Sequence, residues 1–77
     1  MSPRLPRATG AEVLRVLFRL GWEEARQTGS HHHLRHPKKP GALVTVAVHA
    51  GRHLPVGTLA AILDAAGLTG DELRKLI

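Results

Sequence analysis

Two turn-forming segments divide the middle of this 77-residue chain into three short stretches with the pattern of β-strands. The turns are "TGS" at residues 28–30 and "PKKPG" at residues 37–41, both rich in residue types that favour tight turns. The clearest strand is "LVTVAV" at residues 43–48, because its β-branched valines alternate with other side chains. The other two are "WEEARQ" at 22–27 and "HHHLRH" at 31–36. Three hairpin-linked strands need a cover on one face, which constrains the rest of the chain.

The segments on both sides of these strands predict helices that supply this cover. "TGAE" at residues 9–12 and "TGDE" at 69–72 are capping boxes, in which Thr and Glu satisfy two helix-start amides. Apolar side chains recur on one helical face after the first box and again in "LAAILDAAGL" at 59–68. Gly21 and Gly67 are suited to end the two longer helices. We therefore predict an α+β fold: helix, three-stranded antiparallel sheet, helix and short C-terminal helix, with the helices packed on one sheet face.

Charge is distributed unevenly along the chain. Lys and Arg number 11 against 6 Asp and Glu, and no carboxylate lies between Glu24 and Asp64, the interval that holds all six histidines. A central region of one sign attracts a phosphate backbone. The same gap in carboxylates disfavours a two-metal nuclease, which needs them as ligands. The lack of Cys excludes disulfides and thiolate zinc sites.

The length allows one small domain, which we expect to span residues 9–77. Residues 1–8, with two prolines, are expected to be a flexible N-terminal arm. The start of the chain lacks the apolar core of a signal peptide, and no apolar run approaches the roughly 18 residues that span a membrane. We expect a cytoplasmic protein.

Three motifs in a fixed order carry a resemblance to a known family: "GSHHHLRHP" at residues 29–37, "VTVAVH" at 44–49 and "LPVGTLAAILDAAGL" at 54–68. Over residues 10–68 the chain resembles the HicA toxins. The resemblance implies a fold like that of double-stranded-RNA-binding domains and mRNA interferase activity that depends on one histidine of the second strand. It also implies mRNA and a HicB-type antitoxin as partners, with no small-molecule cofactor. In the family's G-S-x-H pattern the active histidine is the second residue after the serine, here His32.

The residues support this chemistry without the resemblance, because histidine is the side chain whose ordinary pKa, about 6.5, suits a general base near neutral pH. In a regular strand His32 shares a face with Leu34, which should face the helices, so His32 is expected to be partly buried. His31 and His33 then point the other way and are more open. A bulge after the first turn would reverse this assignment, so His31 stays a candidate for the catalytic residue.

Five further residues are candidates for RNA contact through charge or position near the histidines: Ser30, Arg35, Lys38, Lys39 and His49. The alternative for the two lysines is a solvated turn, and for His49 an ordinary strand-end polar residue. Zinc or nickel binding by His31 and His33 is a weaker alternative, because structural zinc prefers four ligands. Amides near Gly57, at the start of the second helix, are a further possible phosphate contact.

Two other functions fit the same basic surface. A non-catalytic RNA-binding module would bind RNA with strong salt dependence and leave it intact. A partner-binding domain would use the charge to complement an acidic protein, such as an antitoxin. The predicted function remains a metal-independent endoribonuclease.

Overall fold

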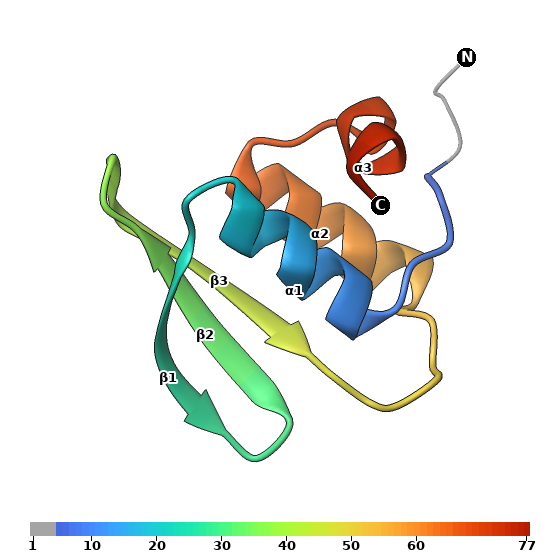
Figure 1. The fold of residues 1–77 in the computed structure, drawn as a ribbon, viewed down its shortest axis with the longest axis horizontal. Helices are drawn as coiled ribbons and strands as arrows, with labels where there is room; N and C mark the ends of the chain where they lie inside the picture. Colours follow the sequence, from blue (N-terminus) through green and yellow to red (C-terminus); the bar gives the residue numbers. More distant parts are fainter. Residues whose placement is uncertain (1–4) are drawn as a thin grey trace.

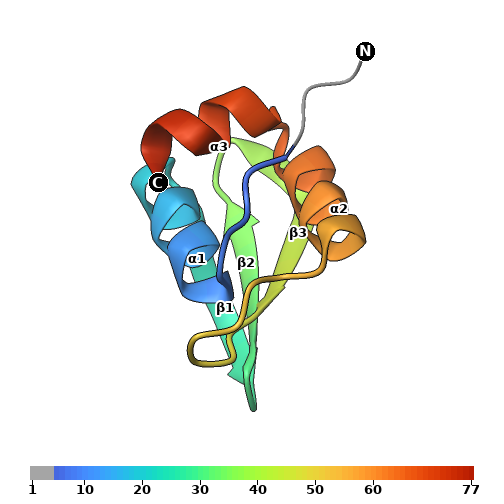
Figure 2. The ribbon, with the colours of Figure 1, turned by 90° about the vertical axis from the view of Figure 1, so that its right-hand side faces the viewer.

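A computed structural model describes residues 5–77, and its element order is the predicted one (Figure 1). The elements are α1 (Gly10–Arg19), β1 (Glu23–Thr28), β2 (His31–His36), β3 (Lys39–Ala47), α2 (Val56–Ala66) and α3 (Gly70–Leu76). The three strands form one antiparallel sheet in the order β1-β2-β3. Both longer helices cover the same face of the sheet, and α3 lies across their ends (Figure 2). The predicted α+β architecture is confirmed.

The two hairpin turns are shorter than the sequence pattern suggests. β1 and β2 are joined by two residues, Gly29 and Ser30, and the φ angle of Gly29 is +58°. A two-residue loop with glycine first in the left-handed region matches the twist of antiparallel strands. The second turn also has two residues, so the predicted turn over 37–41 is wrong, because β3 already begins at Lys39. β3 is an edge strand, which accommodates the missing amide of Pro40.

The strand register decides which face each side chain of β2 occupies. His32 pairs with Gln27 on one side and Val46 on the other, and pairing is regular from the first turn to His33. The irregularities lie elsewhere, between Glu24 and Arg26 and after Leu34. The bulge that would have reversed the faces of the histidines is therefore not at the first turn.

Both predicted capping boxes are present. The Thr9 hydroxyl accepts a hydrogen bond from the Glu12 amide (3.1 Å), and the Glu12 carboxylate accepts one from the Thr9 amide (2.8 Å). Thr69 and Glu72 repeat this arrangement at α3, with distances of 3.1 and 2.9 Å. These hydrogen bonds lower the pKa of both carboxyl groups from the ordinary 4.5.

One hydrophobic core lies between the sheet and the helices. Its buried members are Ala8, Val13, Val16, Leu17, Trp22, Leu34, Val44, Val46, Leu59, Ile62, Leu63, Ala66 and Leu73. Leu34 is the only β2 side chain in this group, as its apolar character predicts. Phe18, an apolar side chain of α1, lies outside this core and is 45% exposed.

The N-terminal segment packs more closely than expected. Ala8 is fully buried, and its carbonyl accepts a hydrogen bond from the Leu54 amide (2.8 Å). Leu5 packs against the core, and the flexibility of the expected arm of residues 1–8 stays a prediction. Its first four residues lie outside the described part of the chain. Within residues 5–77, none of the helices is long and apolar enough to cross a membrane.

Candidate functional site

His32 lies at the boundary between the core and the solvent. Its side chain is 17% exposed and shares the helix-facing side of the sheet with Leu34, which is fully buried. The strand alternation that predicted this partial burial is thus confirmed. The backbone of the central strand fixes the position of the ring, because β2 is hydrogen-bonded to a neighbour on both sides.

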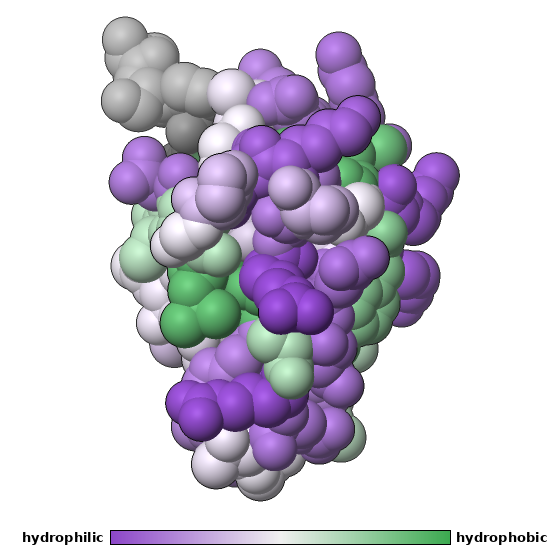
Figure 3. All heavy atoms as spheres, turned by 90° about the vertical axis from the view of Figure 1, so that its left-hand side faces the viewer, coloured by the Kyte–Doolittle hydropathy of each residue, from purple (hydrophilic) through white to green (hydrophobic). Residues whose placement is uncertain are grey.

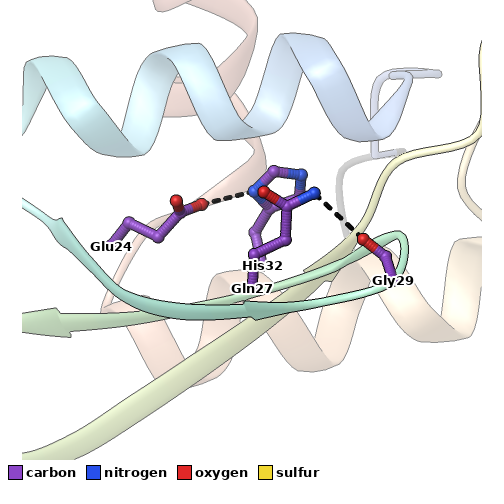
Figure 4. Close-up of polar contacts among 4 residues, drawn as sticks. All are labelled: Glu24, Gln27, Gly29 and His32. Carbon is purple, nitrogen blue, oxygen red and sulfur yellow. Dashed lines mark hydrogen bonds and ion pairs between the residues drawn. The ribbon is translucent and has the colours of Figure 1, made fainter.

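The ring of His32 is held by a carboxylate from the neighbouring strand. Nδ1 of His32 is hydrogen-bonded to Oε1 of Glu24 (Figure 4). An ionised carboxylate only accepts hydrogen bonds, so the bonding proton belongs to Nδ1 of the ring. This leaves Nε2 as the nitrogen that can accept a proton. The pair therefore selects one tautomer of the imidazole, as an orienting carboxylate does in acid-base catalysis.

Glu24 was not among the site residues predicted from the sequence. In the register Glu24 lies opposite Leu34, two residues along β2 from His32 and on the same face. Such diagonal neighbours on adjacent strands are within reach of long side chains. The sequence held one indication of a role for Glu24, because it is the last carboxylate before the interval that contains all six histidines. To predict the contact with His32, one also needs the pairing of residues between β1 and β2, which is irregular directly after Glu24.

Gln27 supports the same site from β1. It pairs with His32 across the strands, and its Nε2 donates a hydrogen bond to the carbonyl of Gly29 (2.9 Å; Figure 4). This contact links Gln27, which lies opposite His32, to the turn between β1 and β2. The carbonyl of Ser30, a predicted RNA contact, accepts a hydrogen bond from the Val48 amide (2.9 Å). The turn is thereby tied to both neighbouring strands.

The odd-numbered side chains of β2 lie on the other face of the sheet. His31 is exposed and pairs with Ala47, while the ring of His33 is hydrogen-bonded to the Thr45 hydroxyl (3.0 Å). Arg35 is exposed on the same strand. The structure thus does not bring His31 and His32 together in one site, although they are consecutive in the chain.

His36 and Lys39 have structural contacts at the far end of the hairpin. Nε2 of His36 is hydrogen-bonded to the carbonyl of Leu20 (3.0 Å), and its ring meets Trp22 edge-on with centroids 5.3 Å apart. Nζ of Lys39 donates to the Ala66 carbonyl at the end of α2 (3.1 Å) and lies 5.8 Å from the Trp22 ring. A cation at a helix C-terminus stabilises the helix. RNA contact by Lys39 stays a prediction, and in this structure it competes with these contacts.

Lys38 and His49 are both exposed. The side chain of Lys38 is in the second turn, and its amide donates to Nδ1 of His36 (3.1 Å). His49 was expected to close the third strand, but β3 ends at Ala47 and His49 lies in the loop that follows. Of the predicted site residues, the structure brings His49 and His31 together around one pocket.

The surface beside the β1 edge is largely hydrophilic, with small apolar patches (Figure 3). All six residues of β1 are exposed, and they include Glu24 and Gln27. Among residues 5–77, no three His, Asp or Glu side chains are arranged to hold a metal ion. An imidazole held in one orientation, as that of His32 is, can take up and release a proton near neutral pH.

Residues 10–68 match the family model described as HicA toxin of bacterial toxin-antitoxin, which is most of the 77-residue chain. A search of curated proteins finds no match.

Proposed function

Because this chain belongs to the HicA toxin family, whose members are the toxins of bacterial toxin-antitoxin systems, we propose that it is a metal-independent mRNA interferase with His32 as its general base. The observation that carries the proposal is the oriented imidazole. His32 is partly buried on the central strand, and Glu24 holds the proton on Nδ1. Nε2 is thereby left as the base.

The reaction follows from this tautomer. Nε2 of His32 takes the proton of a 2′-hydroxyl, and the 2′-oxygen forms a bond to the adjacent phosphorus. The bond from phosphorus to the 5′-oxygen breaks, and this oxygen receives a proton from the protonated imidazole or from water. The products are a 2′,3′-cyclic phosphate and a free 5′-hydroxyl. General base and acid assistance of this kind contributes roughly 10²- to 10⁴-fold to a rate.

Glu24 acts in this scheme as a positioning residue. It does not contact the RNA, but it keeps the ring in one orientation and stabilises the imidazolium that forms during the reaction. Arg35 and Lys38, both exposed on the same hairpin, attract the RNA backbone through charge. The side chain of His31 leaves β2 on the face opposite to His32, so we propose His31 as an RNA contact and not as the base.

The HicA family implies a cognate antitoxin as partner. We propose a HicB-type antitoxin, mRNA as substrate, the cytoplasm as the compartment, and residues 9–77 as the functional domain. The net charge of +5 favours both an acidic protein partner and RNA.

The test is cleavage of a single-stranded RNA in EDTA by protein purified free of antitoxin. His32→Ala is expected to lower the rate by about 100-fold or more, from the loss of base catalysis. The matched control is His33→Ala, which removes a neighbouring ring on the other face of β2 and should cleave at close to the unmodified rate. RNA that is bound but stays intact with the unmodified protein would identify a binding module in place of an enzyme. Full activity of His32→Ala would also overturn the proposal.

A further inference from the structure

A second concave site lies where β3 ends and the loop of residues 48–55 leads to α2. This pocket has a volume of about 510 Å³. Four basic side chains line it: His31, His49, Arg52 and His53. We call it the basic pocket. Only His31 and His49 were candidates from the sequence, and the sequence did not indicate that they share a site.

The lining of the basic pocket combines one guanidinium group and three imidazole rings with an apolar surface. Ala47 and Leu54 supply apolar atoms, and Thr58 in the first turn of α2 adds a hydroxyl group. Within the described residues 5–77, no carboxylate lines the pocket. The pKa of Glu12 is lowered chiefly by its hydrogen bonds with Thr9 and only to a smaller extent by His53, because that carboxylate is engaged in the capping box. This lining suits an anion attached to a flat or apolar group.

The backbone holds the loop in place around the pocket. The Leu54 amide donates to the carbonyl of Ala8 (2.8 Å), and His53 forms a bridge with Thr9 just before α1. The Arg52 amide donates to the carbonyl of His49 (3.0 Å), which closes a turn within the loop. Figure 2 shows this loop passing below the start of α1 on its way to α2. The basic side chains therefore project from an anchored segment.

The basic pocket and the His32 site begin at the same end of the sheet. His31 lines the pocket and His32 is the next residue, so their Cα atoms are about 3.8 Å apart. Their side chains leave the strand on opposite faces. An RNA strand that crosses this end of β2 would contact the two sites with different nucleotides.

We propose that the basic pocket binds a phosphate-bearing nucleotide of the RNA, next to the bond that is cleaved at His32. This inference rests on the proposed function. The volume of the basic pocket is within the range of about 300 to 1,000 Å³ that is usual for small-ligand sites. Arg52 supplies a guanidinium that fits a phosphate group in a bidentate manner. α2 begins beside the pocket after Pro55, whose position provides no side-chain cap, so the positive end of the helix dipole adds to the field.

The test measures binding of a short 2′-O-methyl RNA, which resists cleavage because its 2′-oxygen carries no proton. The variants are Arg52→Gln and His53→Gln, both at exposed positions, so the fold is expected to be retained. Lys75→Gln is the matched control, because it removes one exposed positive charge on α3, at the other side of the molecule (Figure 2). Dissociation constants are measured over a range of salt concentrations for each variant.

We expect the double variant of Arg52 and His53 to bind the RNA at least about tenfold more weakly and to lose part of the salt dependence, by about 0.7 in the logarithmic slope for each lost phosphate contact. Lys75→Gln should bind like the unmodified protein. Equal weakening in all variants would show a general charge effect and overturn the pocket. A protein that binds RNA through the pocket without cleaving it would refute the proposed function alone. A protein that cleaves RNA but is indifferent to the pocket variants would refute the pocket alone.

Discussion

One side chain of the edge strand decides which nitrogen of His32 carries the proton. Neutral imidazole has two tautomers, and the partner of one nitrogen selects between them. In this chain the partner is Glu24, so the proposed base is Nε2. The sequence showed the histidine, because its place after Gly29 and Ser30 is part of a short motif. The sequence did not show that Glu24 contacts this histidine, because the contact joins two neighbouring strands whose register is irregular beside Glu24.

Replacing Glu24 tests this role directly. In Glu24→Ala the ring loses the acceptor at Nδ1, and we expect the proton to move to Nε2 in the neutral form, with a rate reduced by about tenfold or more. Glu24→Gln keeps an acceptor oxygen and should retain the tautomer and part of the rate. The measurement is the pair of ring ¹⁵N chemical shifts of His32, together with RNA cleavage. Unchanged ¹⁵N shifts in Glu24→Ala would contradict the positioning role.

Two glycines allow a comparison of backbone strain with and without a steric clash. Gly21 has a φ angle of +96°, and a Cβ there would lie 2.9 Å from Nε2 of His36. Gly29 has a φ angle of +58°, and a Cβ there would meet nothing within 4 Å. We expect Gly29→Ala to cost about 1 kcal/mol, from the left-handed backbone alone, and Gly21→Ala to cost more. Chemical denaturation of both variants gives the comparison, and equal losses would rule out the clash with His36.

At the scale of elements, the helix-capping signals were the most reliable part of the sequence. The structure has both predicted capping boxes, at residues 9–12 and 69–72. Gly67 ends α2 in the left-handed conformation, as predicted. The second hairpin turn was predicted too long. Pro40 and Gly41 favour turns locally, but pairing with β2 extends β3 back to Lys39. Pairing between strands is a tertiary interaction, and it overrode the local preference.

The capping boxes predict a loss of stability in acid. The pKa values of Glu12 and Glu72 are lowered in the folded state from the ordinary 4.5, chiefly by the backbone amides of Thr9 and Thr69. A lowered folded pKa adds stability that is fully present above the unfolded value and is lost as the pH falls through the folded value. Stability should therefore decrease as the pH falls below about 4.5. Glu12→Gln should flatten this decrease, as measured by denaturation at several pH values.

The control for the acid effect is the same substitution in a Thr9→Ala background. Without Thr9 the capping box lacks one of its two hydrogen bonds, and the helix start is expected to lose about 1 kcal/mol. Part of the pKa shift of Glu12 comes from that side chain. The pH effect of Glu12→Gln should thus be smaller in this background, and an equal effect would contradict the account.

At the scale of the whole molecule, the fold was predictable because its layers follow from alternation and helical spacing. Leu34 identified the inner face of β2, and the valines of β3 identified the same face of their strand. The basic pocket was not predictable in the same way. It combines residues from β2, the loop after β3 and α2, and only the packing of α1 and α2 on the sheet brings them together. Charge composition indicated a polyanion but not where it binds.

The burial of two leucines on neighbouring strands predicts a large difference in the stability that is lost when each is replaced by Ala. Leu34 is fully buried, whereas Leu43 on β3 is 59% exposed. Leu34→Ala should cost about 2–5 kcal/mol, and Leu43→Ala less than about 0.5 kcal/mol. Domains of this size have a total stability of only some 4–12 kcal/mol, so the first variant should be close to unfolding at 37 °C. Thermal denaturation checks both, and similar losses in the two variants would refute the assignment of the inner face.

Trp22 gives the molecule a single built-in optical probe. It is the only tryptophan, the chain has no tyrosine, and its side chain is 3% exposed. His36 from β2 and Lys39 from β3 both contact its ring, directly after the end of α1. Its emission therefore reports whether this junction of three elements is assembled. Neither the His32 site nor the basic pocket includes Trp22, so RNA that contacts only these two sites should leave the emission nearly unchanged, while unfolding alters it. Folding and binding can then be followed separately in one unlabelled sample.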